Sequence, residues 1–572
     1  MTATNNFIVT QTETGTTPLR TRWLGTVGYS EAWDLQQRLF SGHHDHLLLC
    51  EHPPVFTFGL RGDEANLLVD PAELGAERFR VNRGGDVTFH GPGQLVGYPV
   101  MSVPGKRGGG MADTVAYVAA VEQLLIDVSA ELGLETGRLE RHPGVWVDPH
   151  GPMPRKLAAV GVRVSRGRSM HGFALNVDVD LDWFGHIVPC GIADKGVTSL
   201  AAEGIDAAMT DVVELVIASA SRRLAGSRTI ERSDVTLRAS PGELDLAPFS
   251  LGAGPGDTIK PAGTPVRLGK RLEEAGVTEG LSISDRKPDW MRVKLRTDPE
   301  YLRLKKVART LELTTVCEEA GCPNIFDCWN EGTATFMLLG DRCTRACGFC
   351  LIDTRKPEPV ESDEPERVAA AVRDLSLDYA VLTMVARDDL ADGGAAVVAA
   401  TVEAIRSEVA DVGVEVLISD LKGSVEALDV VCASRPDVVN HNVETVARLQ
   451  RAVRPSASYA RSLALLARVV DRGLTAKSGI IVGMGERPDE VKATLADLAA
   501  IGVDIVTIGQ YLRPTSNHLP MHRWWTPEEF EELKRFGEHD LGITHVESSP
   551  LTRSSHHAGS AAAGVRDILN KP

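Results

Sequence analysis

The chain has 572 residues, of which 43% are hydrophobic, and it carries a formal net charge of −17. This length is too great for one ordinary core and predicts two or three domains. The acidic balance argues against a nucleic-acid-binding surface, which needs clustered Lys and Arg, and no apolar run reaches the roughly 18 residues of a membrane-spanning helix. Residues 1–20 lack the apolar core of a signal peptide, so we expect a cytoplasmic protein that binds neither nucleic acid nor membrane.

The order of elements along the chain indicates two structured domains joined by a linker. Residues 1–17 are polar and are expected to be disordered, whereas residues 18–230 alternate short strand-like runs with helices. Asp113 is placed to cap a helix. The apolar residues of that helix recur at spacings of three and four, namely Val118, Val121, Leu125, Val128 and Leu132. Residues 231–283 are rich in Gly and Pro from about 240, which predicts a flexible linker.

A turn-dense segment in the first domain runs from Arg83 to Gln94 and contains four glycines. Glycine allows the backbone to approach a ligand closely, and Arg83 and His90 add polar side chains. Gly/Pro turns between strands look similar, so this pattern alone does not decide between a binding segment and an ordinary connection.

Cys190 and Lys156 form a candidate catalytic pair in the same domain. A thiolate can carry an acyl group for one step, and a nearby ammonium would stabilise it and later act as a base. The spacing does not by itself bring the two residues together. A single cysteine after a proline is more often a small buried residue, so that alternative stays open.

The second half of the chain shows a repeated strand-then-helix order, which predicts a parallel sheet curled into a full or partial (β/α) barrel. The predicted strands are Thr335 to Leu339, Ala380 to Val385, Glu415 to Ile418, Asp437 to Val439, Ser478 to Val482 and Ile505 to Ile508. In such barrels the chemistry lies at the carboxyl ends of the strands. Distinctive residues do follow these strands: the cysteines after Leu339, Arg387-Asp-Asp389, Asn440-His-Asn442 and Gln510.

Nine cysteines occur in the chain, and six of them fall between positions 317 and 350. Cys343, Cys347 and Cys350 form a C-x3-C-x2-C loop directly after a predicted strand. Three thiolates can hold a four-iron cluster and leave one iron open to S-adenosylmethionine. A zinc knuckle with a fourth ligand elsewhere is the alternative.

A second cysteine triad lies just upstream, at Cys317, Cys322 and Cys328. It predicts a second cluster that also lacks a fourth cysteine. In the alternative interpretation two of these cysteines complete the neighbouring site, but thiols are then left over. Cys50 and Cys432 match no motif and are predicted to be core residues.

Residues from about 284 to 565 resemble lipoyl synthase, which makes 284–572 the second predicted domain. The matching motifs are both cysteine triads, Arg387 to Gly394, Asn440 to Thr445, Lys477-Ser-Gly479, Gln510 to Pro514 and Arg553-Ser-Ser555. The residue after the two serines is His556, where the family has a tyrosine.

The resemblance implies two [4Fe–4S] clusters and S-adenosylmethionine as cofactors. The radical-generating cluster falls to Cys343, Cys347 and Cys350. The auxiliary cluster, which is consumed as the sulfur source, falls to the second triad with a serine as fourth ligand, and we favour Ser555 over Ser554. Gly393 and Gly394 are expected to let the backbone approach the methionine end of S-adenosylmethionine. Asn440, His441 and Asn442 are expected to hydrogen-bond it, or alternatively to form a polar cap on a strand end.

Residues 18–230 resemble lipoyl(octanoyl) transferase, a relative of the biotin and lipoate ligases with an α+β fold. The resemblance rests on Glu51 to Val55, Arg83 to Gln94, Lys156, His171-Gly172 and Pro189-Cys-Gly191. It implies that Cys190 is the acyl-thioester nucleophile and Lys156 its acid/base partner. The residues implied to line the acyl and donor site are Arg83, Gly84, Gly85, Asp86, Val87, Thr88, Phe89, His90, Ala159, Val160, Gly161, Gly172, Phe173 and Ala174.

Together the resemblances predict a bifunctional enzyme of lipoyl cofactor synthesis. The first domain would move octanoate from acyl carrier protein to a lysine of lipoyl domains, in 2-oxoacid dehydrogenase complexes or the glycine cleavage H-type protein. The second would insert sulfur at C6 and C8 of that chain, with electrons from a donor such as a ferredoxin or flavodoxin. Two alternatives remain: an ATP-dependent lipoate ligase in the first half, or a non-catalytic protein with zinc in its cysteine loops.

Overall fold

The computed structural model divides the chain into two compact units, Met1–Leu237 and Arg238–Pro572. It describes residues 17–106, 110–188, 195–236, 271–283, 285–291, 303, 306–307, 310–311, 313, 315, 333–515 and 517–569. Residues 1–16 of the predicted disordered segment 1–17 and most of the predicted linker 231–283 lie outside these residues, so the domain limits remain a prediction.

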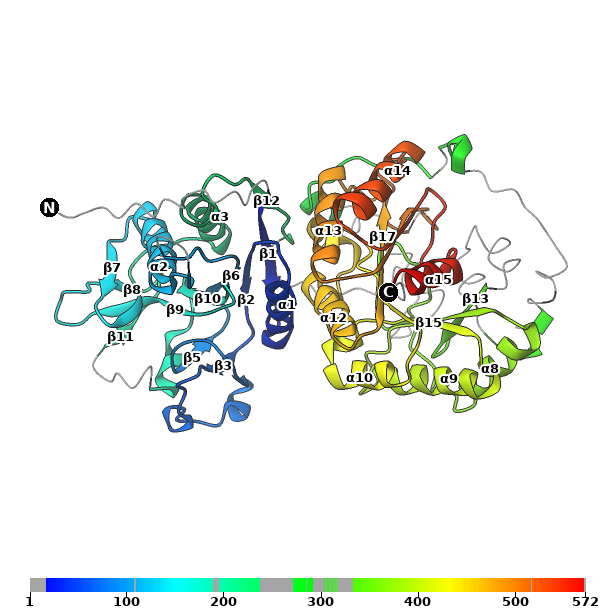
Figure 1. Cartoon of the computed structure of the whole chain (residues 1–572), viewed down its shortest axis with the longest axis horizontal. Coiled ribbons are helices and arrows are strands. Elements are labelled where there is room, and N and C mark those ends of the chain that lie inside the picture. Colours follow the sequence, from blue (N-terminus) through cyan, green and yellow to red (C-terminus); the bar gives the residue numbers. More distant parts are fainter. Residues whose placement is uncertain are drawn as a thin grey trace. The chain divides into compact units, whose positions relative to one another are not determined.

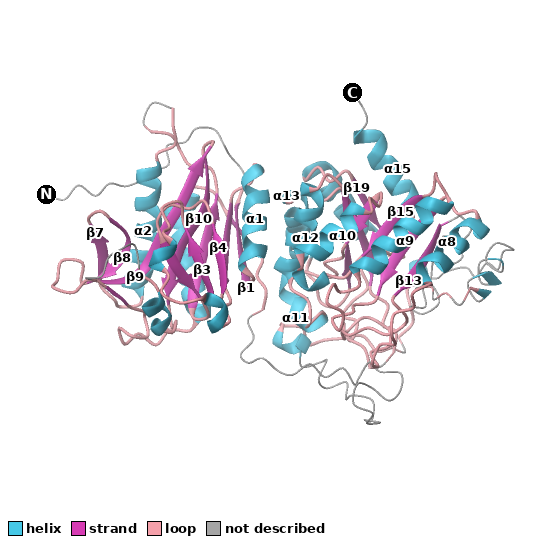
Figure 2. Cartoon of the chain, turned by 90° about the horizontal axis from the view of Figure 1, so that it is seen from below, coloured by secondary structure: helices cyan, strands magenta, loops and turns pink. Residues whose placement is uncertain are grey.

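The first unit is an α+β domain with a large mixed sheet and a small one (Figures 1 and 2). The large sheet has the order β12-β1-β2-β6-β10-β9-β8-β7, with β11 added beside β9, and the small sheet has the order β4-β3-β5. The strands of this unit are β1 (Leu19–Thr26), β2 (His46–Glu51), β3 (Val55–Phe58), β4 (Glu77–Arg80), β5 (Val87–His90), β6 (Gln94–Val100), β7 (Thr136–Leu139), β8 (His142–Val147), β9 (Arg155–Ser165), β10 (Arg168–Asn176), β11 (Gly196–Val197) and β12 (Ile230–Arg232). Its α-helices are α1 (Tyr29–Ser41), α2 (Thr114–Glu131) and α3 (Met209–Ala220).

The helix predicted after Asp113 is confirmed as α2. The Asp113 carboxylate accepts a hydrogen bond from the Ala116 amide at 3.1 Å, which satisfies one of the free donors of the first turn. Val121, Leu125 and Val128 are buried, so the apolar spacing read from the sequence does mark the inner face.

The second unit is a curved sheet of seven parallel strands in the order β13-β14-β15-β16-β17-β18-β19. Its strands are β13 (Thr333–Leu338), β14 (Tyr379–Met384), β15 (Gly413–Leu417), β16 (Val438–Asn440), β17 (Thr475–Val482), β18 (Ile505–Gln510) and β19 (His545–Ser548). Its α-helices are α8 (Glu364–Leu375), α9 (Ala395–Glu408), α10 (Val425–Ala433), α11 (Gln450–Val453), α12 (Tyr459–Asp471), α13 (Pro488–Ala500), α14 (Pro527–Arg535) and α15 (Ala558–Leu569).

This arrangement confirms the predicted parallel sheet and partial barrel. All six predicted strands are present. The seventh, β19, was not predicted, because of its four residues only Val546 is both apolar and buried. Figure 2 shows the helices outside the strands and the loops gathered at one end of the sheet.

Helix α15 packs against one end of the sheet. Ala558, Ala561, Ala562 and Val565 form a buried cluster with residues of β14, β16 and β18. Tyr379, Val438 and Ile505 in that cluster are the first residues of their strands, so α15 covers the amino end and leaves the carboxyl end for a binding site.

A fully buried ion pair lies within the sheet, between Lys477 of β17 and Glu415 of β15. Both side chains are 1% exposed, and Lys477 Nζ lies 2.9 Å from each carboxylate oxygen. Asn440 of β16 donates a further hydrogen bond to Glu415 at 2.9 Å. The pair therefore connects three consecutive strands.

We expect Lys477→Met to destabilise the second unit by about 3–5 kcal/mol, because it leaves the Glu415 carboxylate buried without its counter-charge. Lys492→Met is the matched control. Lys492 pairs with Glu532 at 2.6 Å, but both side chains are substantially exposed, so its loss should cost only about 0–1 kcal/mol. Urea unfolding of the full-length chain measures both, and equal losses would contradict the expectation.

None of the helices in the described part of the chain combines the length and apolar character that crossing a bilayer requires.

Candidate active sites of the two units

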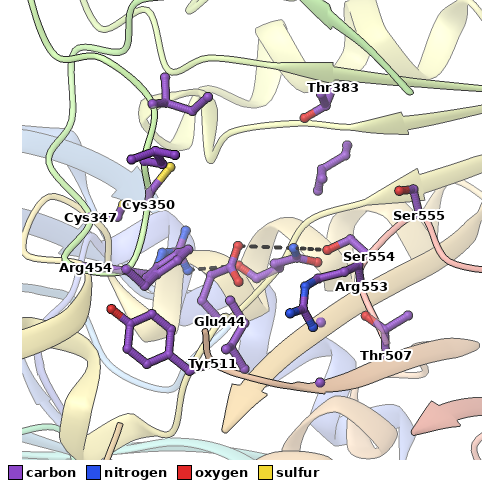
Figure 3. A pocket seen from close by; sticks show the side chains of 18 of the residues that line it. Cys347, Cys350, Thr383, Glu444, Arg454, Thr507, Tyr511, Arg553, Ser554 and Ser555 are labelled. Carbon is purple, nitrogen blue, oxygen red and sulfur yellow. Dashed lines mark hydrogen bonds between the residues drawn. The ribbon is translucent and has the colours of Figure 1, made fainter. Parts of the chain in front are cut away.

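The second unit contains a cavity of about 600 Å³ at the carboxyl ends of its strands. Residues of β13, β14, β15, β17 and β18 and of the segment after β16 line it, together with the cysteine loop on one side and Arg553, Ser554 and Ser555 on another. Figure 3 shows Cys347 and Cys350 across the cavity from the two serines, with Arg454 on the side of the cysteines and Glu444 between Arg454 and Ser554. A volume of this size suits a cofactor-sized ligand.

Backbone hydrogen bonds hold the three-cysteine loop against the segment that follows it and against helix α11. The Cys343 amide donates to Asp353 O at 2.8 Å, and the Gly348 amide donates to Val453 O at 2.8 Å. Gly348 has no room for a side chain, because a Cβ there would lie 2.6 Å from the Leu519 side chain. The sequence Cys343 to Cys350 therefore fits a tightly fixed loop.

Arg345 connects this loop to the ends of two strands. Its guanidinium donates to both oxygens of Asp388 at 2.7 Å and to Asp420 at 2.6 Å. Asp420 is completely buried. Burial alone would raise the pKa of its carboxyl, but the charge and hydrogen bond of Arg345 lower that pKa to about 2. The pair therefore stays ionised at neutral pH.

The three thiols suit a soft metal centre. Burial raises the pKa of Cys347 to about 11 and that of Cys350 further still, because a lone thiolate is poorly solvated there. Iron would stabilise the thiolate form, and three thiolates facing a cavity are the ligand set of an iron–sulfur cluster with one open iron. These residues thus fit the cluster that the sequence predicts.

A polar network lies across the cavity, and it joins the predicted cofactor residue Asn442 to Glu444 and Arg454, which were given no role from the sequence. Asn442 Nδ2 donates to Ser554 Oγ at 2.7 Å and to Glu444 Oε1 at 3.1 Å. Arg454 donates to the Asn442 carbonyl at 2.9 Å. The buried Oδ1 of Asn442 accepts no hydrogen bond from any residue that the structure describes, so it could accept one from a bound ammonium group.

The other predicted cofactor residues are placed differently. His441 lines the cavity, but its Nδ1–H donates to Ile418 O and its Nε2 accepts from the Ser462 hydroxyl, both at 2.9 Å. Asn440 points to Glu415, and neither it nor Gly393 or Gly394 is among the residues that line the cavity.

Several predicted cluster ligands cannot be placed. Cys317, Cys322 and Cys328 lie outside the described residues. Ser555 faces the cavity, whereas the Ser554 hydroxyl is already engaged by Asn442. Cys50 and Cys432 are both buried, which confirms the prediction that they are core residues.

In the first unit, Arg83 and His90 meet at Thr57 of β3. Arg83 Nη2 donates to the Thr57 carbonyl at 2.6 Å and to its hydroxyl at 3.0 Å. His90 donates from Nδ1 to Gln94 Oε1 at 2.7 Å, and its Nε2 lies 3.4 Å from the Thr57 hydroxyl. Both predicted polar residues therefore hold the 83–94 segment against the small sheet.

The strand β5 within this segment presents its side chains alternately. Val87 and Phe89 belong to the buried cluster of the small sheet, with Phe56 and Phe58. The Phe89 ring also stacks on Trp183 with 4.7 Å between centroids. Asp86 accepts from the side-chain amide of Asn66 at 2.6 Å, which fixes the turn before the strand.

Glycines bring the three predicted lining segments together. The Gly84 amide donates to Val162 O at 3.2 Å, and a Cβ on Gly161 would lie 3.2 Å from Gly84 O. Gly161 pairs with Gly172 across β9 and β10. A Cβ on Gly172 would lie 2.1 Å from Gly97 O, so this position requires glycine. Segments 83–90, 159–161 and 172–174 are therefore neighbours.

Lys156 lies on β9, with its Nζ 4.7 Å from the centre of the Trp146 ring. Cys190 lies outside the described residues. The strand that follows it in the sequence, β11, pairs with β9 so that Val197 is beside Lys156. The chain thus returns to Lys156 shortly after Cys190.

Three buried histidines lie near this site, and among them only His90 was predicted to line it. His52 donates from Nδ1 to Val27 O and accepts at Nε2 from the Tyr98 hydroxyl, both at 2.7 Å. Nε2 of His171 lies 2.9 Å from Asn82 Oδ1. Burial lowers the pKa of His52 to about 4 and the pKa values of His90 and His171 to about 3, so all three are neutral at pH 7.

A three-cysteine loop beside a cavity at the carboxyl end of a parallel β/α sheet defines the class of radical S-adenosylmethionine enzymes. The Radical SAM superfamily matches residues 337–498, and the Lipoyl protein ligase A/B catalytic domain matches residues 28–221. The chain belongs to the lipoyl synthase family through its second unit and carries a lipoyl protein ligase A/B catalytic domain in its first.

Curated relatives cover the second unit. Lipoyl synthase of Rubrobacter xylanophilus is 53% identical over 274 residues, which are 48% of this chain and 85% of the relative. Lipoyl synthase of Mycolicibacterium paratuberculosis is 51% identical over 291 residues, which are 51% of this chain and 94% of the relative.

Solved structures resemble each unit separately. The bipartite lipoate protein ligase of Thermoplasma acidophilum is 17% identical, with a TM-score of 0.32, and the match covers 38% of this chain and 88% of that one. Methylornithine synthase is 13% identical, with a TM-score of 0.31, and the match covers 49% of this chain and 90% of that one.

We expect the first unit to lose stability as the pH falls below about 6.5, because its buried histidines bind protons only after unfolding. Because these pKa values are lowered in the folded chain, the neutral histidines contribute fully to the free energy of unfolding above the unfolded-state pKa. That contribution is lost as the pH falls toward 3–4. His90→Gln should reduce the slope by about 1.4 kcal/mol per pH unit. Hydrogen exchange in β6 peptides, measured from pH 7.5 to 5, gives this slope.

The exposed His43 provides the control, since His43→Gln removes a histidine with no comparable burial. An unchanged slope in His90→Gln would show that His90 is protonated equally in the folded and unfolded chain.

Proposed function

We propose that the chain builds the lipoyl cofactor on its carrier proteins in two steps, one in each unit. The first unit transfers octanoate from acyl carrier protein to a lysine of a lipoyl domain. The second unit inserts two sulfur atoms, at C6 and C8 of the attached chain. The observation that carries this proposal is the cavity of the second unit, which has three cysteines on one side and the Arg553-Ser-Ser555 segment on the other.

Both family matches and the curated relatives support an enzyme of lipoyl cofactor biosynthesis, with a sulfur-inserting unit and an acyl-handling unit. The substrates of the first unit are lipoyl domains, such as those of 2-oxoacid dehydrogenase complexes and the glycine cleavage H-type protein. The second unit takes electrons from a small donor protein such as a ferredoxin or flavodoxin.

In the first unit Cys190 attacks the octanoyl thioester and carries the acyl group as a second thioester. As an ammonium, Lys156 stabilises the Cys190 thiolate and then gives a proton to the departing thiolate of acyl carrier protein. The resulting neutral Lys156 amine accepts the proton of the attacking lysine, and the Cys190 thiolate leaves as the amide forms. The pairing of β11 with β9 at Lys156 supports this pair. The alternative, an ATP-dependent lipoate ligase, is disfavoured because adenylation needs no thiol.

In the second unit Cys343, Cys347 and Cys350 hold one [4Fe–4S] cluster, and Cys317, Cys322, Cys328 and Ser555 hold the other. The first cluster with S-adenosylmethionine supplies the radical chemistry that breaks the C–H bonds. Asn442, Glu444 and Arg454 bind and orient the polar end of S-adenosylmethionine. A serine oxygen is a poorer iron ligand than a thiolate, which suits a cluster that must give up its sulfur.

We expect Cys190→Ala to lower octanoyl transfer by about 10³-fold or more, because the acyl carrier is removed. Lys156→Gln should lower it by about 10²–10⁴-fold through loss of proton transfer. The assay uses octanoyl-acyl carrier protein and an unmodified lipoyl domain, and mass spectrometry measures the octanoylated lipoyl domain that forms.

Cys432→Ala controls for the loss of a cysteine, because Cys432 is a buried residue of the other unit. Full activity of Cys190→Ala, or a requirement for ATP and free octanoate, would instead establish the ligase.

For the second unit, we expect anaerobically purified protein to contain about eight iron and eight sulfide per chain, two four-iron clusters' worth. Cys347→Ala should lower the count to about four and abolish cleavage of S-adenosylmethionine, while octanoyl transfer continues. Iron and sulfide analysis with a cleavage assay measures these effects.

Ser555→Ala provides the complementary variant, since it should retain cleavage of S-adenosylmethionine but lose sulfur insertion. Four iron per wild-type chain, or zinc in place of iron, would rule out the two-cluster assignment.

A further inference from the structure

A cluster of histidines around one carboxylate lies outside the cysteine sites of the second unit. Glu547 and His545 belong to β19, and His556 and His557 precede α15. One ligand atom from each of Glu547, His556 and His557 lies within 4.8 Å of the others. The two consecutive imidazoles are stacked, with 3.9 Å between centroids, and His557 has a left-handed φ of +52°.

Two histidine nitrogens lie just beyond hydrogen-bond distance of Glu547, and the spacing to His557 suits two ligands of a common ion. Oε1 lies 3.7 Å from His557 Nδ1, and Oε2 lies 3.6 Å from His545 Nε2. Tetrahedral zinc with bonds of about 2.1 Å places neighbouring ligand atoms about 3.4 Å apart. Nε2 of His545 is buried and has no hydrogen-bond partner among the described residues, so a polar atom faces this carboxylate unsatisfied.

We propose that Glu547, His556 and His557 bind one divalent transition-metal ion of the zinc type. Two imidazoles and a carboxylate are a recurrent ligand set for zinc, whereas magnesium and calcium prefer oxygen ligands alone. The side chains of His557 and Glu547 are 40% and 20% exposed, which leaves access for the ion. His545 Nε2 lies 3.6 Å from the second oxygen of Glu547, and closing this gap when the ion binds would let His545 donate to that oxygen and orient it.

This site uses none of the cysteines and does not depend on the proposed function. Its two parts come from the edge strand β19 and from the segment that directly follows Ser555. A bound ion would therefore connect the edge of the sheet to the Arg553-Ser-Ser555 segment.

The test uses the full chain, purified anaerobically with its clusters in place, and Zn²⁺ alone as the probe. Isothermal titration calorimetry should show one tight equivalent, with the iron content unchanged before and after. Glu547→Gln and His557→Gln should each weaken binding by at least about 100-fold, because each removes one of three ligands. His545→Gln should weaken it by about 10-fold, the effect of removing an orienting neighbour.

His539→Gln is the matched control, because His539 is an exposed histidine of the same unit, outside the cluster. It should bind Zn²⁺ as the wild type does. Thermal melting without zinc checks that each variant is folded. If Glu547→Gln or His557→Gln does not fold, His556→Tyr removes the third ligand instead and should weaken Zn²⁺ binding to the same extent. Absence of a tight equivalent, wild-type binding in both ligand variants, or zinc uptake that releases iron would each overturn the proposal.

Discussion

The salt bridges of Arg345 are the constraint on which the second unit depends. Arg345 lies between Cys343 and Cys347 in the sequence. Its guanidinium donates to Asp388 after β14 and to the buried Asp420 after β15. The pairing compensates the burial of the Asp420 charge, which would otherwise be strongly unfavourable. Loop and sheet are thereby held in one geometry, so the thiols face the cavity at a fixed position. In the first unit, Arg83 has the corresponding role where it meets Thr57.

Much of the architecture could be predicted because it is encoded locally. Strand and helix periods, the Asp113 cap and the cysteine spacing are all readable within a dozen residues. The polar network of the cavity is different. Asn442 and Ser554 are 112 positions apart, and Arg345 and Asp420 are 75 apart, so only the folded sheet brings them together. Strand β19 was not predicted, because a strand with one buried apolar side chain gives no apolar run in the sequence.

The sequence predicted the glycines of the first unit's site more reliably than the polar side chains of the second unit's cavity. Glycines at 84, 161 and 172 were expected near a ligand, and their close backbone contacts give a physical reason for glycine there. Asn440 and His441 were expected at a cofactor, yet their side chains bond mainly to Glu415, Ile418 and Ser462. A polar residue at a strand end can serve the sheet as readily as a ligand. His90 was expected at the site, whereas the hydrogen bonds of His52 with Tyr98 and of His171 with Asn82 were not, because they join residues 46 and 89 positions apart.

Helix α15 has a consequence for the carboxyl-terminal part of the chain. It begins three residues after Ser555, and its alanine-rich face is seated on the first residues of three strands. The serine segment is thus tethered between β19 and a helix that is itself anchored in the core. The position of Ser555 is therefore restrained from both sides. A cluster bound to its hydroxyl oxygen could lose sulfur while the surrounding backbone keeps its place. Small side chains at 558, 561 and 562 let the helix approach closely enough to provide this restraint.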